Sequence, residues 1–311
     1  MSGPVEYSDA SFTVDPVHEE RGLAFDIFPS RNTTVGHTLV RRALPKRQRR
    51  TIGQWCFADH FGPIELPPGE AAMEVGPHPH IGIQTVTWLL EGKIIHRDSL
   101  GYEQLISPGQ LNLMTAGFGV AHSEESPRET AQKLHGIQLW IAQPNSSRNG
   151  EPTFEHHSGL PQTNFDNATA TVLIGNYGNS TSPANTDGKT VGAEISFAIG
   201  ESILELKSGF EYGIIILEGQ VIIGTKAVAP GMLLYLGRGR NELPVYAPQP
   251  STIMLLGGEP FEEPILMWWN FVARTQSEIT EAYQAWQGRD TRFGKVESGL
   301  TRIEAPKPYW L

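Results

Sequence analysis

Two short segments of the sequence recur, in the same order, in the second half of the chain. Leu89–Ile94 is echoed by Ile216–Val221, and Ser107–Leu113 is echoed by Ala229–Tyr235. A match that is kept in order over such a distance indicates that one structural unit has been duplicated. The chain has 311 residues, which is enough for two units that each bury a core of their own. The repeat therefore predicts two tandem domains.

The repeated units have the composition of β-structure. Short runs of Val, Ile and Leu alternate with turn residues, and the chain contains 33 glycines and 23 prolines. Ile83–Leu90 is such a run; it stops at Glu91-Gly92 and resumes at Lys93–Asp98, which predicts a hairpin. We expect an all-β fold of two β-barrels.

One helix is predicted near the end of the chain, at Ser277–Gln287. Ile279, Ala282, Tyr283 and Trp286 recur at helical spacing and form one apolar face. Ser277 is the expected N-cap, and Gly288 stands just past the expected end. We expect the apolar face to dock on a barrel.

Two pairs of candidate metal ligands lie in the first unit, His78 with His80 and His122 with Glu124. The members of each pair are two residues apart, so on a strand both side chains point to the same face. If the two strands are neighbours, three imidazoles and one carboxylate meet. That donor set suits a divalent transition metal with open coordination positions.

Other polar residues near these pairs are weaker candidates. Gln84 stands two pleats beyond His80 on the same strand face. It either lines the pocket, where it would hydrogen-bond a metal-bound water or substrate, or packs in the barrel. His60 falls in a predicted turn and either packs structurally or supports the ligands. His96 and Asp98 also share a face, but we expect a salt pair at a strand end or a solvated turn.

Composition restricts the partners and the compartment. The formal charge is −10, from 24 Lys and Arg against 34 Asp and Glu, so we expect no direct binding of nucleic acid and no membrane surface. The single cysteine, Cys56, excludes an intrachain disulfide. The sequence has no apolar run of the length that a signal peptide or a membrane span needs. These features predict a cytoplasmic protein, and we expect a monomer.

A series of motifs stands along the chain: Asp59–Pro63, His78–Gly82, Thr85-Val86, Leu89–Gly92, Pro108-Gly109, Met114–Gly117, His122–Glu124, His135–Trp140 and Leu255–Pro260. In these motifs and in the C-terminal helix the sequence resembles the pirins, a two-domain family within the cupin superfamily, over about residues 20–290. The resemblance implies an N-terminal metal-binding cupin domain at 20–160 and a C-terminal cupin domain at 161–311. All ten histidines fall at or before His157, so we expect the second domain to be without metal ligands. Outside the resemblance, residues 1 to about 20 are polar and acidic without periodicity, and we expect them to form an arm. The segment Pro264–Phe271 departs from the form common in the family and could pack on either barrel.

The resemblance also implies a cofactor and two alternative functions. In pirins, three histidines and one glutamate hold the metal, usually iron, which carries over onto His78, His80, His122 and Glu124. The cofactor would be Fe(II), although Mn, Co, Ni, Cu or Zn suit the same donors. One function is dioxygenation of a flavonol such as quercetin, with Glu124 taking the substrate proton. The alternative is a non-enzymatic, iron-dependent redox regulator that binds a protein partner, a transcription factor or a metabolic enzyme.

Overall fold

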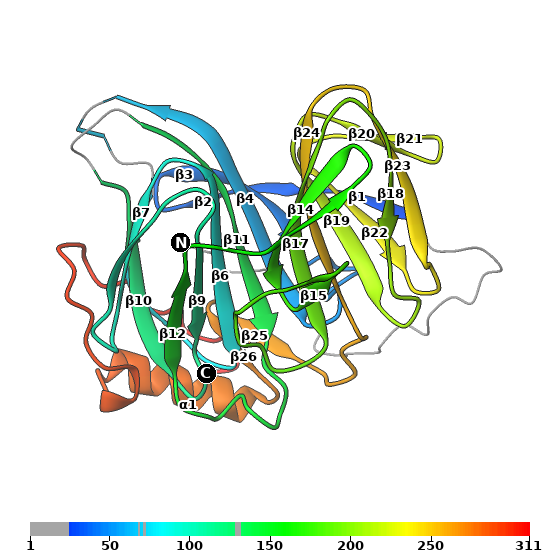
Figure 1. The fold of residues 1–311 in the computed structure, drawn as a ribbon. Helices are drawn as coiled ribbons and strands as arrows, with labels where there is room; N and C mark the ends of the chain where they lie inside the picture. The colour runs from blue at the N-terminus through cyan, green and yellow to red at the C-terminus, as the bar shows by residue number, and fades with distance from the viewer. Residues whose placement is uncertain (1–24, 68, 71–72, 128–131) are drawn as a thin grey trace.

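The computed structural model describes residues 25–67, 69–70, 73–127 and 132–311. The predicted arm of residues 1–20 lies outside the described residues. Within the described part of the chain, two β-barrels lie side by side, and a helix near the end of the chain lies against the first of them (Figure 1). The predicted all-β fold with two barrels and one short C-terminal helix is confirmed.

The first barrel consists of a seven-stranded and a four-stranded antiparallel sheet. In spatial order, the larger sheet contains β12 (Thr153–His157), β9 (Leu111–Thr115), β6 (Ile83–Glu91), β11 (Gln132–Ala142), β4 (Trp55–Leu66), β3 (Thr38–Leu44) and β2 (Arg31–Val35). The smaller contains β5 (Glu74–His80), β10 (Val120–Glu125), β7 (Ile94–Asp98) and β8 (Glu103–Ile106).

The second barrel has the same pair of sheets. Its larger sheet runs β1 (Asp26–Pro29), β22 (Met232–Gly237), β19 (Glu211–Glu218), β24 (Ser251–Gly258), β17 (Thr190–Phe197), β14 (Ala168–Ile174) and β13 (Gln162–Phe165). Its smaller sheet runs β18 (Gly200–Glu205), β23 (Glu242–Ala247), β20 (Val221–Ile223) and β21 (Lys226–Val228). Two further pairs stand apart, β15 (Asn176–Tyr177) with β16 (Ser180–Thr181) and β25 (Leu266–Trp268) with β26 (Phe271–Ala273).

The duplication predicted from the sequence extends to the order of the strands. The repeated segments form β6 and β9 in the first barrel and β19 and β22 in the second, and each pair lies side by side in its sheet. In the smaller sheets, β18 and β23 stand where β5 and β10 stand in the first barrel. One buried apolar cluster joins the two barrels, because Trp55 and Val86 pack in it with Ile215 and Leu233.

Each barrel also takes in a segment from the other half of the chain. β1 pairs with β22 and so lies in the second barrel, where it is drawn in blue beside yellow strands (Figure 1). The end of the chain, from β25 onward, packs on the first barrel, since Trp268 and Trp286 share a buried cluster with Ile81. The division expected near residue 160 falls between β12 and β13, but these two segments cross it.

The hairpin predicted for Ile83–Asp98 is wrong. β6 pairs with β9 and β11 in the larger sheet, whereas β7 pairs with β8 and β10 in the smaller one. The chain turns the corner between the sheets at Gly92, where φ is 88° and a Cβ would lie 2.2 Å from the carbonyl oxygen of Lys133. Glycine tolerates both this backbone conformation and this close approach.

The C-terminal helix α1 (Gln276–Gln287) begins at a different cap from the predicted one. Thr275, not Ser277, is the N-cap: its hydroxyl accepts from the amide of Glu278, and the Glu278 carboxylate accepts from the amide of Thr275. Thr and Glu three residues apart form a capping box, which satisfies two otherwise unpaired amides. The predicted end before Gly288 and the buried face with Ile279, Ala282 and Trp286 are confirmed.

A single-turn helix, η1 (Thr291–Phe293), follows α1. No helix among the described residues combines the length and the apolar character that crossing a membrane requires.

We expect Thr275→Ala to lower the free energy of unfolding by about 1 kcal/mol, because it removes the side chain that caps α1. Urea denaturation measures the change. Ser277→Ala is the matched control: it removes only an exposed contact to Glu281, so we expect a change within about 0.5 kcal/mol. Equal losses in both variants would contradict the assigned cap.

Candidate metal centre

The two predicted ligand pairs lie on neighbouring strands. β5 and β10 are antiparallel, His122 stands directly opposite His78, and Val120 stands opposite His80. The side chains of directly opposed residues in such a pair lie close together on one face. The spacing read from the sequence therefore brings the three imidazoles to one place.

The three histidines form a compact group of potential ligands. One ring nitrogen from each of His78, His80 and His122 lies within 4.8 Å of the others, and all three side chains are buried. The Nε2 atoms of His80 and His122 are 3.1 Å apart. This is the arrangement expected of imidazoles that converge on one ion.

Backbone carbonyl groups fix the orientation of two of these rings. His78 Nδ1 lies 2.8 Å from the carbonyl oxygen of Gly76, and His80 Nδ1 lies 3.2 Å from that of Asn270, in the turn between β25 and β26. A carbonyl can only accept, so both Nδ1 atoms carry the proton and donate it. Each Nε2 then keeps its lone pair for a metal ion.

A side-chain relay orients the third ring. Asp98 Oδ2 lies 3.1 Å from His96 Nε2, which must donate to it, and His96 Nδ1 lies 3.3 Å from His122 Nδ1. His96 Nδ1 then accepts from His122, and His122 Nε2 also keeps its lone pair. Asp98 is held in turn by the amides of Leu100 and Tyr102.

His96 and Asp98 are paired at the end of β7, as one of the two expected alternatives held, through a hydrogen bond from His96 Nε2. Both side chains are buried, so the other alternative, a solvated turn, is wrong. Their role in orienting His122 was not predicted. The signal that could have found this role is their two-residue spacing, which repeats that of the ligand pairs on a strand that turns out to neighbour β10.

The donor set fits a metal ion. His80 and His122 both carry their proton on Nδ1, so their Nε2 lone pairs face each other at 3.1 Å. Two lone pairs at that distance repel each other unless a cation lies between them. Burial lowers the pKa of His78 to about 4, and burial together with the neighbouring imidazoles lowers the pKa of His80 and of His122 well below the ordinary value. The rings are therefore neutral at pH 7, the form that binds metal.

Glu124 lies beside the group of three. Its side chain is buried and lines the same cavity, and its Oε1 accepts from the hydroxyl of Thr87 at 3.0 Å. The register of β10 against β5 shifts between His122 and Glu124. The Glu124 side chain therefore points in a different direction from the one that a regular strand would give it. Burial raises the pKa of the Glu124 carboxyl.

The cavity around these side chains is small and mostly apolar. It measures about 60 Å³, counted as the space open to the centre of a water molecule. Phe57 and Trp140 form part of its wall as a stacked pair with ring centroids 4.0 Å apart. Asp59 also lines it and forms a buried two-bond ion pair with Arg42, at 2.8 and 2.6 Å. Sequence reasoning missed this pair.

Neither Gln84 nor His60 is among the described residues that line the cavity. The amide of Gln84 donates to Thr115 Oγ1 and to a carbonyl oxygen of the second barrel, that of Asn185. His60 lies in β4, which continues through the predicted turn because Gly62 makes a bulge inside the strand.

The alternation of β4 turns His60 away from the cavity that Asp59 and Phe61 line. The Nε2 atoms of His60 and His135 are 2.8 Å apart, and His135 Nδ1 lies 3.1 Å from Glu218 of β19. His60 therefore belongs to a polar chain that links the two barrels.

Comparison with known proteins identifies both halves of the chain. The family model described as Pirin matches residues 37–141, and the one described as Pirin C-terminal cupin domain matches residues 194–294. The chain is 42% identical to a Pseudomonas aeruginosa protein named as a candidate quercetin 2,3-dioxygenase, over 100% of this chain and 98% of the relative. It is 32% identical to a pirin-like protein of Caulobacter vibrioides, over 88% of this chain and 96% of the relative.

Solved structures show the same architecture. A quercetin 2,3-dioxygenase from Acinetobacter baumannii superposes with a TM-score of 0.89 and 43% identity, over 91% of this chain and 95% of that one. The Escherichia coli pirin YhhW, solved in complex with nickel(II), gives a TM-score of 0.62 at 18% identity, over 76% of this chain and 100% of that one. At that identity the likeness shows the shared fold. Both barrels are cupin domains, as the resemblance implied.

We expect His80→Ala and His122→Ala to abolish tight metal binding, since each removes one of the three converging nitrogens. His157→Ala should leave the affinity unchanged, because His157 pairs with Glu155 on β12 instead. Competition with a chromophoric chelator measures the affinity. Similar losses in all three variants would contradict the assigned ligands.

We expect Asp98→Asn to weaken metal binding by about 10- to 100-fold without removing a ligand. The amide would face His96 Nε2 with a donor or with a weaker acceptor, which disturbs the protonation of His122. Glu103→Gln is the control, because Glu103 only pairs with Arg97 at the surface. Wild-type affinity in Asp98→Asn, measured by the same competition, would contradict the relay.

Proposed function

The chain belongs to the pirin family, and on that premise we propose that it is a metal-dependent dioxygenase that acts on a flavonol such as quercetin. The observation that carries the proposal is the convergence of three neutral imidazoles in a buried cavity with an aromatic wall. Two similar proteins at 42% and 43% identity bear the name quercetin 2,3-dioxygenase, the first as a candidate.

In this proposal His78, His80 and His122 hold the ion through Nε2, and Glu124 completes the set. Bound there, an Fe(II) ion, or Mn, Co, Ni, Cu or Zn in its place, supplies Lewis acidity and open coordination positions for an oxygen-bearing substrate and dioxygen. The carbonyl groups of Gly76 and Asn270 and the relay from Asp98 keep the rings in the binding tautomer before the substrate arrives.

Glu124 is the proposed base for the substrate hydroxyl. Thr87 donates to its Oε1, so Oε2 is the oxygen that would bind the ion or take the proton. Burial raises the pKa of this carboxyl, which makes its ionised form a stronger base than an exposed glutamate.

The cavity walls supply binding and exclude water. Phe57, Trp140 and Val75 offer apolar and aromatic surface to a planar ring system. The buried Arg42–Asp59 pair places a carboxylate in that wall, where it can accept a hydrogen bond from a substrate hydroxyl.

We expect iron-loaded protein to consume oxygen when quercetin is added, and Glu124→Gln to lower the rate by about 100-fold or more at saturating iron. An oxygen electrode measures both. Glu125→Gln is the matched control. The carboxylate of Glu125, the next residue in the chain, contacts Arg97 and Ser298, and Glu125 is not among the described residues that line the cavity.

Absence of metal-dependent oxygen uptake in iron-loaded wild-type protein would contradict the dioxygenase. Intact metal binding without turnover would favour the regulatory alternative.

A further inference from the structure

The end of the chain forms part of the metal cavity of the first barrel. Trp269 and Asn270, in the turn between β25 and β26, and Ile303, in the tail after α1, all line it. Trp269 and Asn270 belong to the segment Pro264–Phe271, which departs from the common form of the family. The sequence left open which barrel this segment packs on; it packs on the first.

Two glycines that bracket the His-Pro-His motif let these segments approach. A Cβ on Gly82 would lie 2.3 Å from the carbonyl oxygen of Val272, just after the turn. A Cβ on Gly76 would lie 2.0 Å from the carbonyl oxygen of Thr301, just before Ile303. No side chain fits at either distance, so glycine on both sides of the ligands is what admits the end of the chain.

Direct contacts join the same segments to the ligand strand. The carbonyl group of Asn270 faces His80 Nδ1 at 3.2 Å, and the amide of Ile303 donates to the carbonyl oxygen of Pro77 at 2.9 Å. Pro77 directly precedes His78. The two segments, the turn at Asn270 and the tail at Ile303, thus contact the His-Pro-His motif from both of its ends.

Trp269 has an unusual backbone conformation for its residue type. Its φ is 53°, and apart from glycines only Arg289 also has a positive φ among the described residues. Bulky residues rarely adopt this region, and they persist there where the surrounding structure holds them for a function. The neighbouring Trp268 points elsewhere: it packs on Tyr309 and Trp310, donates to the carbonyl oxygen of Pro306, and is not among the lining residues.

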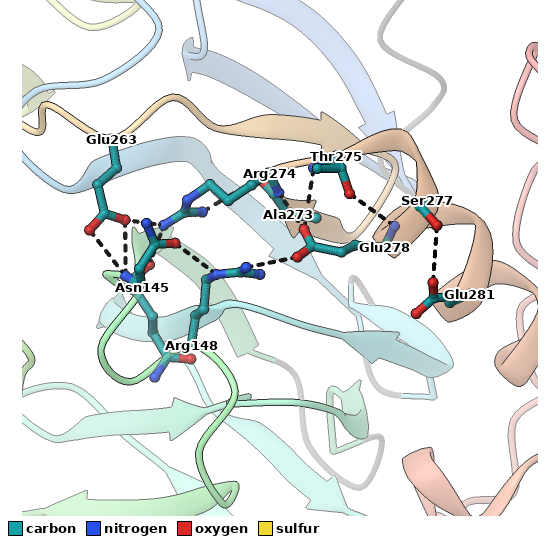
Figure 2. Close-up of polar contacts among 10 residues, drawn as sticks. Asn145, Arg148, Glu263, Ala273, Arg274, Thr275, Ser277, Glu278 and Glu281 are labelled. Carbon is teal, nitrogen blue, oxygen red and sulfur yellow. Dashed lines mark hydrogen bonds and ion pairs between the residues drawn. The ribbon is translucent and has the colours of Figure 1, made fainter.

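A polar network clamps the turn to the first barrel (Figure 2). Glu263 accepts from the amide of Asn145 and from the Arg274 guanidinium, whose Nη2 also donates to the carbonyl oxygen of Gln143 at 2.8 Å. Glu278 of α1 pairs with Arg148 at 2.7 Å. Trp269 lies in sequence between Glu263 and Arg274, so both ends of its segment are fixed.

The cavity has little free space, and this determines how much of a ligand the wall would contact. The centre of a water-sized probe can move through only about 60 Å³ beside the ligands, so the lining side chains stand close to any ligand placed there. A three-ring flavonol extends further from its metal-binding oxygens than a compact ring with two adjacent hydroxyls does. More of the flavonol therefore meets the lining residues Trp269 and Ile303.

We propose that Trp269 and Ile303 form a wall, supplied by the end of the chain, that selects substrates of the metal centre by size. This inference rests on the proposed function, because it assumes an oxygen-bearing aromatic ligand at the metal. Trp269 and Ile303 act by steric contact with the rings beyond the metal-binding oxygens. A compact ligand has fewer atoms beyond the metal-binding oxygens, so it meets less of this wall.

The test compares the binding of a compact and a large ligand without turnover. Zinc-loaded protein is titrated with catechol and with quercetin in a calorimeter, for the wild type, Trp269→Ala and the matched control Trp268→Ala. Ile303→Ala repeats the test from the other segment if Trp269→Ala fails to fold, and thermal unfolding reports the folding of each variant. Chelator competition verifies that each variant binds zinc equally.

We expect Trp269→Ala to shift the ratio of the two affinities toward quercetin by about tenfold or more, which is the scale of steric discrimination in apolar pockets. Ile303→Ala should shift it in the same direction, and Trp268→Ala should leave it unchanged despite its lost packing. An unchanged ratio in both cavity variants, an equal shift in Trp268→Ala, or no binding of either ligand to any variant would overturn the proposal.

The two proposals fail in different ways. A shifted binding ratio together with no oxygen uptake by the iron-loaded protein would contradict the dioxygenase and leave the wall standing. Oxygen uptake with quercetin together with an unchanged ratio would contradict the wall alone.

Discussion

The proposed metal centre depends on one constraint: three buried imidazoles must all present an unprotonated nitrogen to the same point. Each ring can do so only if its other nitrogen has an acceptor, and each acceptor comes from a different part of the chain. The carbonyl group of Gly76 serves His78 from the ligand strand itself, His96 serves His122 from the neighbouring strand, and Asn270 serves His80 from the end of the chain. Because burial disfavours the protonated rings, a lost acceptor would leave a costly unpaired donor.

This constraint accounts for the difference between the two barrels. Their strands follow the same order, but β18 and β23, which replace the ligand strands, carry no histidine. Their inward side chains, such as Leu204 and Val245, join the apolar cluster that fills the second barrel. The second barrel instead stabilises the first through hydrogen bonds across their interface. Trp55 donates to the carbonyl oxygen of Val191, and the Glu211 carboxylate accepts from the amide of Gly53.

Local patterns in the sequence predicted the fold and the three histidines because both depend on periodicity. The two-residue spacing of His78 and His80 fixes a shared face, and the repeated segments fix a duplicated barrel. The corner at Gly92 could not be predicted, since an apolar run followed by Glu-Gly suits a hairpin and a crossing between sheets equally well. What separates them is the approach of the Lys133 carbonyl group, which lies 41 residues further along the chain in β11.

The parts of the site that the sequence did not predict all come from long-range contacts. Asn270 lies 190 residues from His80, and nothing in either local sequence indicates that they meet. Gln84 shows the reverse: it was expected to share the face of His80, but its amide donates to Thr115 and Asn185, and it is not among the described residues that line the cavity. A two-residue spacing gives the face of a strand, and only the packing of the whole chain decides what that face meets.

The most direct test of this account is the anomalous difference density of crystals grown from protein reconstituted with one equivalent of a transition metal. The account predicts a single strong peak about 2.0–2.2 Å from Nε2 of His78, His80 and His122, with the Glu124 carboxylate as the fourth protein ligand. A peak elsewhere, such as between His60 and His135, or no peak after reconstitution, would contradict it.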